Sequence, residues 1–202
     1  MKNVAAVLFD MDGTLVDSDA VNEHLWRLWA RRFSLDEQEV AAFQVGRPAP
    51  LTIRRFLPRI SAAEFAALVA EHEDRETHTL DGVTAAKGAH DVLSVLAARG
   101  LPWAVVTSAG RPLAEVRLAA SGIAPPVLVT LHDVPAGKPD PSGYLQAAAS
   151  LGVDPARCLV VEDSETGAEA GRAAGMRVAT LKGLPGDPPL AHLGELAGLL
   201  DL

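Results

Sequence analysis

Carboxyl groups, hydroxyls and one lysine occur in short polar motifs that each follow an apolar stretch of the chain. The motifs are Asp10-Met11-Asp12-Gly13-Thr14, Thr107-Ser108, Gly137-Lys138-Pro139 and Glu162-Asp163-Ser164. If the motifs meet, the two aspartates of the first join Glu162 and Asp163, and unpaired carboxylates in one crevice raise one another's pKa. A hard divalent cation removes this conflict, and ligands that are all oxygen suit Mg²⁺.

The remaining groups of these motifs suit a phosphate. Lys138 carries a point positive charge that can pair with a carboxylate or a phosphate. Thr107 supplies a hydroxyl, and the turns that follow it and Asp12 supply backbone N–H donors. A neighbouring carboxylate can attack phosphorus and form an aspartyl-phosphate. A second carboxylate two residues further on can protonate the leaving oxygen and then deprotonate water.

The motifs can converge only if the preceding apolar stretches are strands of one parallel sheet. Short apolar runs with the character of strands buried on both faces occur at Val4–Phe9, Trp103–Val106, Val127–Val129, Leu159–Val161 and Arg177–Thr180. Helical patterns lie between them at Ala89–Arg99, Pro112–Ala120 and Pro141–Leu151. This alternation predicts an α/β fold with a doubly wound, Rossmann-like parallel sheet. Ligands of such sheets bind at the carboxyl ends of the strands, where the motifs lie.

The segment after the first motif interrupts the alternation. From Asp17 to Asp81 we find no convincing strand, and one helical face carries Val21, Leu25, Leu28, Trp29 and Phe33. The patterns Ser34–Glu37 and Ser61–Glu64 each predict a capping box at the start of a helix. We therefore predict an all-helical cap at residues 17–82, inserted into an α/β core made of residues 1–16 and 83–202.

Composition limits the classes of partner. The 202 residues include 18 Lys+Arg and 26 Asp+Glu, and the formal net charge is −8. This balance argues against a nucleic acid or an anionic membrane as partner. Cys158, the single cysteine, excludes an internal disulfide. The start at Met1-Lys2-Asn3 reaches Asp10 too soon for a signal peptide, and no apolar run approaches the ~20 residues of a membrane span. We expect a monomeric, cytoplasmic protein with a small phosphorylated metabolite as its partner.

In order and spacing, the motifs resemble those of the haloacid dehalogenase superfamily of phosphohydrolases. The resemblance covers nearly the whole chain and is carried by Phe9–Ser18, Val106–Ser108, Gly137–Pro141, Val161–Ser164, Gly167 and Ala173–Met176. The predicted helical insertion resembles the small helical cap of that family. Within the family, Trp26, Trp29-Ala30, Arg32 and Trp103–Ser108 resemble the sugar phosphatases and glycerol-phosphate phosphatases, close to the β-phosphoglucomutase branch.

The resemblance implies a role for each residue that matches the family's catalytic motifs. Asp10 would be the nucleophile and a metal ligand. Asp12 would be the general acid and base, with its backbone carbonyl on Mg²⁺. Thr107 and Lys138 would hold the transferring phosphoryl group, with Ser108 beside them. Because dehalogenases and phosphonoacetaldehyde hydrolases of the superfamily lack the second aspartate, cleavage of C–Cl or C–P bonds is disfavoured.

The resemblance also implies metal ligands and substrate contacts. Asp163 would bind Mg²⁺ directly, and Glu162 would bind it directly or through water. Gly46 and Arg47 of the cap would reach into the crevice and contact substrate, although a solvated arginine is about as common. Asn22 lies at a spacing from Asp10 that matches a substrate contact of the mutase branch.

Structural roles compete with these assignments. Asp10 and Asp12 could be turn residues, Thr107-Ser108 could cap the helix near Pro112, and Lys138 could be a solvated surface side chain. The leading functional hypothesis is a Mg²⁺-dependent phosphatase of a small sugar or polyol phosphate. A phosphosugar mutase would use the same aspartyl-phosphate. A catalytically idle binding scaffold would have lost a catalytic position, and every position is present.

Overall fold

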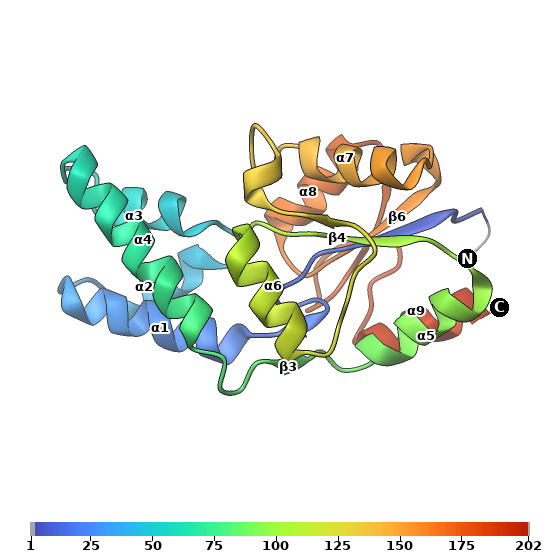
Figure 1. The fold of residues 1–202 in the computed structure, drawn as a ribbon, viewed down its shortest axis with the longest axis horizontal. Coiled ribbons are helices and arrows are strands. Elements are labelled where there is room, and N and C mark those ends of the chain that lie inside the picture. Colours follow the sequence, from blue (N-terminus) through green and yellow to red (C-terminus); the bar gives the residue numbers. More distant parts are fainter. Residues whose placement is uncertain (1–2, 202) are drawn as a thin grey trace.

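The predicted strands form one parallel sheet in the computed structural model, which describes residues 3–201 (Figure 1). Their order is β5-β4-β1-β6-β7. Their bounds are β1 Ala6–Phe9, β4 Trp103–Val106, β5 Leu128–Val129, β6 Cys158–Glu162 and β7 Arg177–Thr180. The predicted doubly wound α/β fold is confirmed. Met1, Lys2 and Leu202, the ends of the predicted core, lie outside the described residues.

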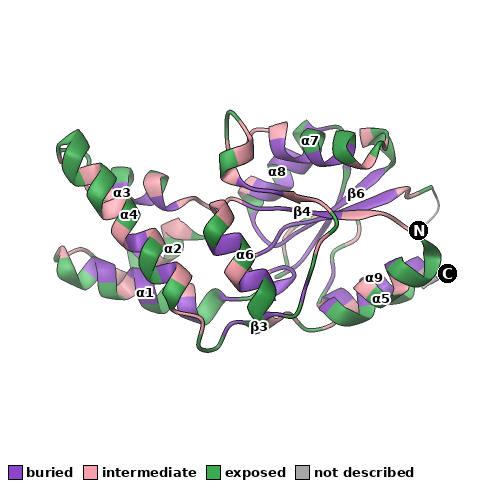
Figure 2. Cartoon of the chain, in the orientation of Figure 1, coloured by how far each residue is buried: buried purple, intermediate pink, exposed green. Residues whose placement is uncertain are grey.

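Alternate residues of β1 face two different apolar clusters. Val7 and Phe9 belong to the cluster covered by α5 Ala89–Arg99, α6 Arg111–Ala120 and α9 Leu193–Asp201. Ala6 and Leu8 belong to the cluster on the other face. That face is covered by α7 Ser142–Leu151 and α8 Glu165–Ala173. Burial on both faces explains why the strands are continuously apolar in sequence (Figure 2).

A helical insertion, residues 19–78, lies at one end of the molecule (Figure 1). It consists of α1 Asp19–Arg32, α2 Glu37–Gln44, α3 Ala49–Phe56 and α4 Ala62–His78. It has its own apolar cluster, which includes Trp26, Trp29, Val40 and Ile53. The aromatic residues of α1 therefore pack inside the insertion. No helix within residues 3–201 is long and apolar enough to cross a membrane.

Two very short strands flank the helical insertion, and the sequence prediction missed both. β2 Val16–Asp17 pairs with β3 Thr84–Ala85 in an antiparallel ribbon, with Asp17 opposite Thr84. Strands of two residues carry no readable periodicity, so the pattern gave no signal for them. Both connections between the insertion and the sheet therefore pass side by side.

The helix starts confirm one predicted capping box and correct the other. Ser61 and Glu64 form the predicted reciprocal pair at the start of α4. The box at Ser34 is wrong: Ser34 has a left-handed backbone with φ 54°, and Asp36 caps α2 instead. Asp36 is an equally good cap residue and lies directly before the helix, where it accepts two backbone N–H bonds.

Two smaller predictions about helices also need correction. Gly110, not Thr107-Ser108, occupies the N-cap of α6, because the chain makes a further turn before that helix begins. Leu28 is 38% exposed and lies off the buried face of α1. Short 3-10 helices occur at Leu131–Asp133 and Pro155–Arg157, the second capped by Asp154.

Candidate active site

Eight of the ten predicted site residues line one cleft between the helical insertion and the sheet, and Lys138 and Glu162 lie beside Asp10. The sheet contributes Asp10, Asp12, Thr107, Ser108 and Asp163, and the insertion contributes Asn22, Gly46 and Arg47. The first motif follows β1, the second follows β4 and the acidic pair ends β6, so the cleft lies at the carboxyl edge of the sheet. Lys138 reaches the same place from the loop before α7.

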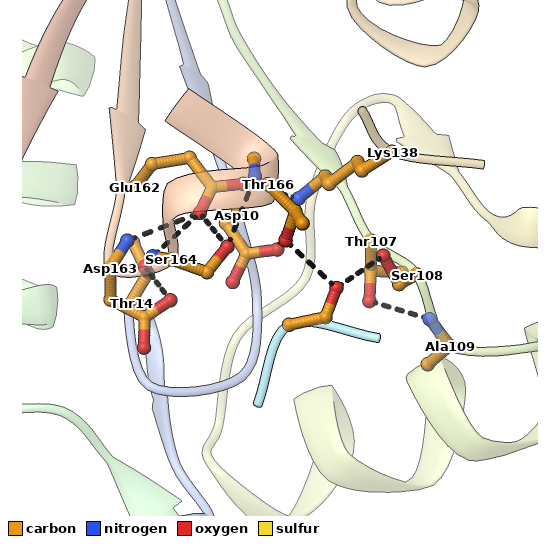
Figure 3. Close-up of polar contacts among 12 residues, drawn as sticks. Asp10, Thr14, Thr107, Ser108, Ala109, Lys138, Glu162, Asp163, Ser164 and Thr166 are labelled. Carbon is orange, nitrogen blue, oxygen red and sulfur yellow. Dashed lines mark hydrogen bonds and ion pairs between the residues drawn. The ribbon is translucent and has the colours of Figure 1, made fainter. Parts of the chain in front are cut away.

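Lys138 joins two carboxylates at the floor of the site (Figure 3). Its Nζ lies 2.5 Å from Asp10 Oδ1 and 2.5 Å from Glu162 Oε1. The lysine side chain is 6% exposed, so the alternative that Lys138 is a solvated surface residue is wrong. A buried ammonium that bridges two carboxylates has a fixed position, which suits a group that orients a nucleophile.

Glu162 is held by donors on both of its carboxylate oxygens. Oε1 accepts from Lys138 and from the hydroxyl of Tyr144, which lies 2.8 Å away. Oε2 accepts from the backbone N–H of Asp163 and from the backbone and hydroxyl of Ser164, at 2.9–3.2 Å. The glutamate is completely buried and its orientation is therefore determined by the protein.

Burial and charge crowding shift the ionisation of these groups. Burial raises the pKa of Asp10 well above its ordinary value, against the effect of Lys138, and the carboxylates of Glu162 and Asp163 raise it further. Burial, with Glu162 second, raises the pKa of Asp163 to about 6. Burial opposes the charge of Lys138, but Asp10 and Glu162 outweigh it and raise the lysine pKa. The site thus concentrates negative charge that a cation would relieve.

Three of these carboxyl groups fit a metal ion. Oxygens of Asp10, Glu162 and Asp163 all lie within 4.8 Å of one another, and all three residues are buried. A set made only of carboxylate oxygens suits a hard cation. Asp163 is further held by Lys182, whose Nζ lies 2.8 Å from its Oδ2, and by the hydroxyl of Thr14.

The Asp12 side chain is held by different partners from those of Asp10. Its Oδ1 accepts from Ser18 Oγ at 2.7 Å and from Arg117 Nη1 at 2.8 Å. Arg117 comes from α6 and is 1% exposed, and it also donates to the side-chain oxygen of Asn22 on α1. The carboxylate predicted to transfer protons is thus hydrogen-bonded in a fixed orientation at the cleft wall.

The loop between α2 and α3 rests directly on the sheet edge. The Gly46 carbonyl accepts from Ser108 Oγ at 3.5 Å and from Thr166 Oγ1 at 3.3 Å. Gly46 has φ +68°, and a Cβ there would lie 2.6 Å from the Cβ of Ser164. Only glycine fits both requirements. Thr107 lines the cleft beside this contact, and its Oγ1 accepts the Ala109 N–H at 3.0 Å.

Arg47 follows Gly46 and lines the cleft, with its guanidinium turned to its own loop. Nη1 donates to the Phe43 carbonyl at 2.6 Å, and the guanidinium carbon lies 4.5 Å above the Phe43 ring. The cleft position matches the prediction. The substrate contact predicted for Arg47 stays a prediction.

Sequence reasoning missed three residues that touch the site. Lys182 follows β7, so it lies at the carboxyl end of the fifth strand, and that position was a readable signal. Tyr144 and Arg117 lie inside helices and gave no signal, because the pattern marks such positions as core. Their partners become visible only when the helices pack on the sheet.

Comparisons with known proteins identify relatives of this arrangement. The family model for haloacid dehalogenase-like hydrolases matches residues 4–175. Hexitol phosphatase A of Escherichia coli (strain K12) is 44% identical over 183 residues, which span 90% of this chain and 84% of that protein. Validoxylamine A 7'-phosphate phosphatase of Streptomyces hygroscopicus subsp. limoneus is 34% identical over 180 residues, 84% of this chain and 81% of that protein.

Among solved structures, the β-phosphoglucomutase of Clostridium difficile has a TM-score of 0.87, and the match covers 96% of this chain and 93% of that chain. At 19% identity this likeness concerns the fold.

Proposed function

This chain belongs to the family of haloacid dehalogenase-like hydrolases, and from that premise we propose that it is a Mg²⁺-dependent phosphatase of a small sugar or polyol phosphate. The observation that carries the proposal is the meeting of Asp10, Asp12, Lys138 and the Glu162-Asp163 pair around one cleft. The similarity to a hexitol phosphatase supports a polyol or sugar as the alcohol part of the substrate.

In the proposed first half-reaction, an oxygen of Asp10 attacks phosphorus and the bond from phosphorus to the sugar oxygen breaks. Asp12 gives its proton to that oxygen, and the alcohol leaves. Lys138 and Thr107 hold the phosphoryl oxygens, with Ser108 beside them. In the second half-reaction, Asp12 takes a proton from water, which attacks the aspartyl-phosphate and releases inorganic phosphate and free Asp10.

Asp10, Asp163 and the backbone carbonyl of Asp12 would hold Mg²⁺, which supplies charge neutralisation at the phosphoryl oxygens. Because both oxygens of Glu162 already accept several hydrogen bonds, we propose that Glu162 acts on the metal through water and positions Lys138 directly.

We further propose that residues 17–82 are a cap over the core, with Asn22, Gly46 and Arg47 on its substrate side. The contact of the Gly46 carbonyl with Ser108 and Thr166 supports this proposal, because Ser108 belongs to the predicted phosphate site. A cap that covers the site would exclude bulk water during phosphoryl transfer.

Release of inorganic phosphate from a broad panel of phosphomonoesters with Mg²⁺ tests the activity. We expect turnover of hexitol and sugar phosphates, and loss of activity on the order of 10⁴-fold or more in Asp10→Asn. Turnover no greater than that of Asp10→Asn for every compound contradicts the proposal. Phosphorus NMR that finds an isomerised phosphosugar and no free phosphate identifies the mutase instead.

A further inference from the structure

Three helices build the wall of the cleft beside Asp12. α1 contributes Asn22, α4 contributes Glu73 and Glu76, and α6 of the core contributes Arg117. We call Asn22, Glu76 and Arg117 the distal wall. These residues line the same cleft as Asp10, and Arg117 bonds Asp12, the residue proposed to protonate the leaving oxygen.

The charge of Arg117 is already shared among groups of the protein. Nη1 donates to Asp12 at 2.8 Å, while Nη2 donates to Asn22 and lies 3.6 Å from Glu76 Oε1. One guanidinium therefore faces two carboxylates, which leaves this part of the wall with a net negative charge when both are ionised. A second anion in this position would compete with Asp12 and Glu76 for the same donors.

The other arginine of the cleft is also bound to the protein. Arg47 is bonded to the Phe43 carbonyl and lies over the Phe43 ring. Arg47 and Arg117 are the lysine or arginine residues among the described residues that line the cleft, and Lys138 and Lys182 pair with Asp10, Asp19 and Asp163 of the same lining. The other carboxyl groups of the lining are those of Asp12, Glu73 and Glu76. A substrate with a carboxylate or a second phosphate beyond its reacting phosphate would meet carboxyl groups without a spare cation.

The Glu76 carboxyl group lines the cleft, and its contacts with charged groups of the protein are long. Its nearest charged neighbours, Arg117 Nη2 at 3.6 Å and His72 Nε2 at 3.9 Å, lie beyond hydrogen-bond distance. Burial, opposed by Arg117, raises the pKa of Glu76 to about 7, so near neutral pH this carboxyl group can accept or donate. An alcohol hydroxyl, which also does both, is its chemical complement.

We propose that Glu76 is a specificity-determining residue that binds a hydroxyl of the leaving alcohol, and that the distal wall selects neutral polyol or sugar monophosphates over phosphates with a second anionic group. This inference rests on the proposed phosphatase activity and goes beyond it, because it states which phosphate esters the cleft rejects and which residue rejects them.

Two substitutions separate the hydroxyl contact from the charge. Glu76→Ala removes the contact, and Glu76→Gln keeps a group of the same shape that can still bond a hydroxyl but carries no negative charge. The probes are sorbitol 6-phosphate, p-nitrophenyl phosphate, whose leaving group has no further hydroxyl, and phosphoglycolate, which has a second anion. Glu71→Ala and Glu71→Gln are matched controls, because Glu71 lies on α4 and pairs with Arg32 and Arg75 at the exposed surface.

In Glu76→Ala we expect kcat/KM for sorbitol 6-phosphate to fall about 10-fold, the value of one hydrogen bond, while p-nitrophenyl phosphate changes less than about twofold. At pH 8, where Glu76 is largely ionised, we expect the ratio of kcat/KM for phosphoglycolate to that for sorbitol 6-phosphate to rise about 10-fold in Glu76→Gln. Both Glu71 variants should match the wild type. Unchanged p-nitrophenyl phosphate turnover also establishes that each variant is folded.

Equal effects on all three compounds in both Glu76 variants, or wild-type ratios in both, overturn the inference and leave the phosphatase intact. A wild-type preference for phosphoglycolate overturns it as well. If the wild type hydrolyses no phosphomonoester of the broad panel better than Asp10→Asn, the proposed function fails and the inference falls with it. Turnover of other phosphates without turnover of sorbitol 6-phosphate overturns the inference alone.

Discussion

At Asp10, one buried lysine serves two carboxylates at once. Asp10, Glu162 and Asp163 contribute three negative charges when ionised, and Lys138 and Lys182 offset two of them. A divalent cation would neutralise the charge that remains. The raised pKa values of Asp10 and Asp163 have the same cause, because burial and mutual repulsion both penalise ionised carboxylates.

Tyr144→Phe tests the role of the buried hydroxyl that donates to Glu162. The change removes one donor and leaves a buried carboxylate with fewer partners, so we expect the free energy of unfolding to fall by about 1–3 kcal/mol. Urea denaturation at constant pH measures it. Stability equal to that of the wild type would contradict the assigned hydrogen bond, and phosphate release would show whether Lys138 has moved.

The pair His72 and Glu76 gives opposing contributions to the pH dependence of stability. Burial lowers the pKa of His72 from 6.5 to about 4, so between these values the unfolded state binds more protons and stability rises with pH. Burial raises the pKa of Glu76 from 4.5 to about 7, so over that range the folded state binds more protons and stability falls with pH. The two slopes oppose each other between pH 4.5 and 6.5.

Single substitutions should reveal each slope. Relative to the wild type, Glu76→Gln should gain stability with rising pH, and His72→Gln should lose it, each by about 1.4 kcal/mol per pH unit. Urea denaturation without added metal, at several pH values from 4.5 to 7, measures the differences. Profiles parallel to that of the wild type would mean that neither group has a shifted pKa.

Residues in strand-end motifs could be predicted from the sequence, whereas residues that reach the site from helix interiors could not. Asp10, Thr107 and Asp163 follow or end strands, and parallel topology alone brings them together. The position of the Arg117 side chain depends on the angle at which α6 packs between the sheet and the insertion. The hydrophobic pattern of the sequence carries no information about that angle.

At the scale of elements, the loop between α2 and α3 is the part of the insertion that touches the sheet edge. Its carbonyl at Gly46 accepts hydrogen bonds from residues after β4 and within α8. The contact therefore depends on a close approach of the Gly46 backbone to the side chains of Ser108, Ser164 and Thr166, and side-chain volume at Gly46 should control whether it forms.

Gly46→Ala should reduce activity without unfolding the protein. The added Cβ would lie 2.6 Å from Ser164, so the loop must shift. We expect kcat/KM to fall on the order of 10²-fold, because small displacements of a positioning loop are costly in catalysis. Gly198→Ala, in α9 with open space around the new Cβ, is the matched control and should keep full activity. Equal activity in both variants would contradict the role of the loop.

Helix capping gives a prediction about stability at the same scale. Ser61→Ala breaks the capping box of α4 and should lower the free energy of unfolding by about 1 kcal/mol. Ser34→Gly should cost nothing, because Ser34 has φ 54° and Asp36 caps α2. Urea denaturation of both variants measures the difference. Equal losses would show that Ser34 also stabilises a helix.

Strands and helices long enough to show several buried positions in the sequence were predicted well, and the strands of two residues were not. β4, β7 and α5 begin and end at the predicted residues, because each has several buried positions and, for α5, a terminal glycine. β2 and β3 form because the two connections between the core and the insertion pair with each other, and their own sequence shows no strand pattern. The domain boundary at 16–17 predicted from the sequence falls inside β2.

For the whole molecule, the formal charge of −8 is concentrated in part where a cation would bind. If Mg²⁺ binds the folded state only, a concentration of 100 times Kd should raise the free energy of unfolding by about 3 kcal/mol. Asp163→Asn should remove most of this increase, and Asp74→Asn, at the exposed end of α4, should keep it. Thermal or urea unfolding with EDTA and with Mg²⁺ measures both. Identical shifts in the two variants would place the ion elsewhere.

The ribbon of β2 and β3 makes the chain modular. Because Asp17 and Thr84 are direct neighbours across the ribbon, the helical insertion enters and leaves the core at nearly one point. A short turn in place of the insertion could join β2 to β3 there without disturbing the parallel sheet. The same geometry would let a different insertion replace this one through recombination at a single site, with the phosphate chemistry of the core retained and a new alcohol recognised.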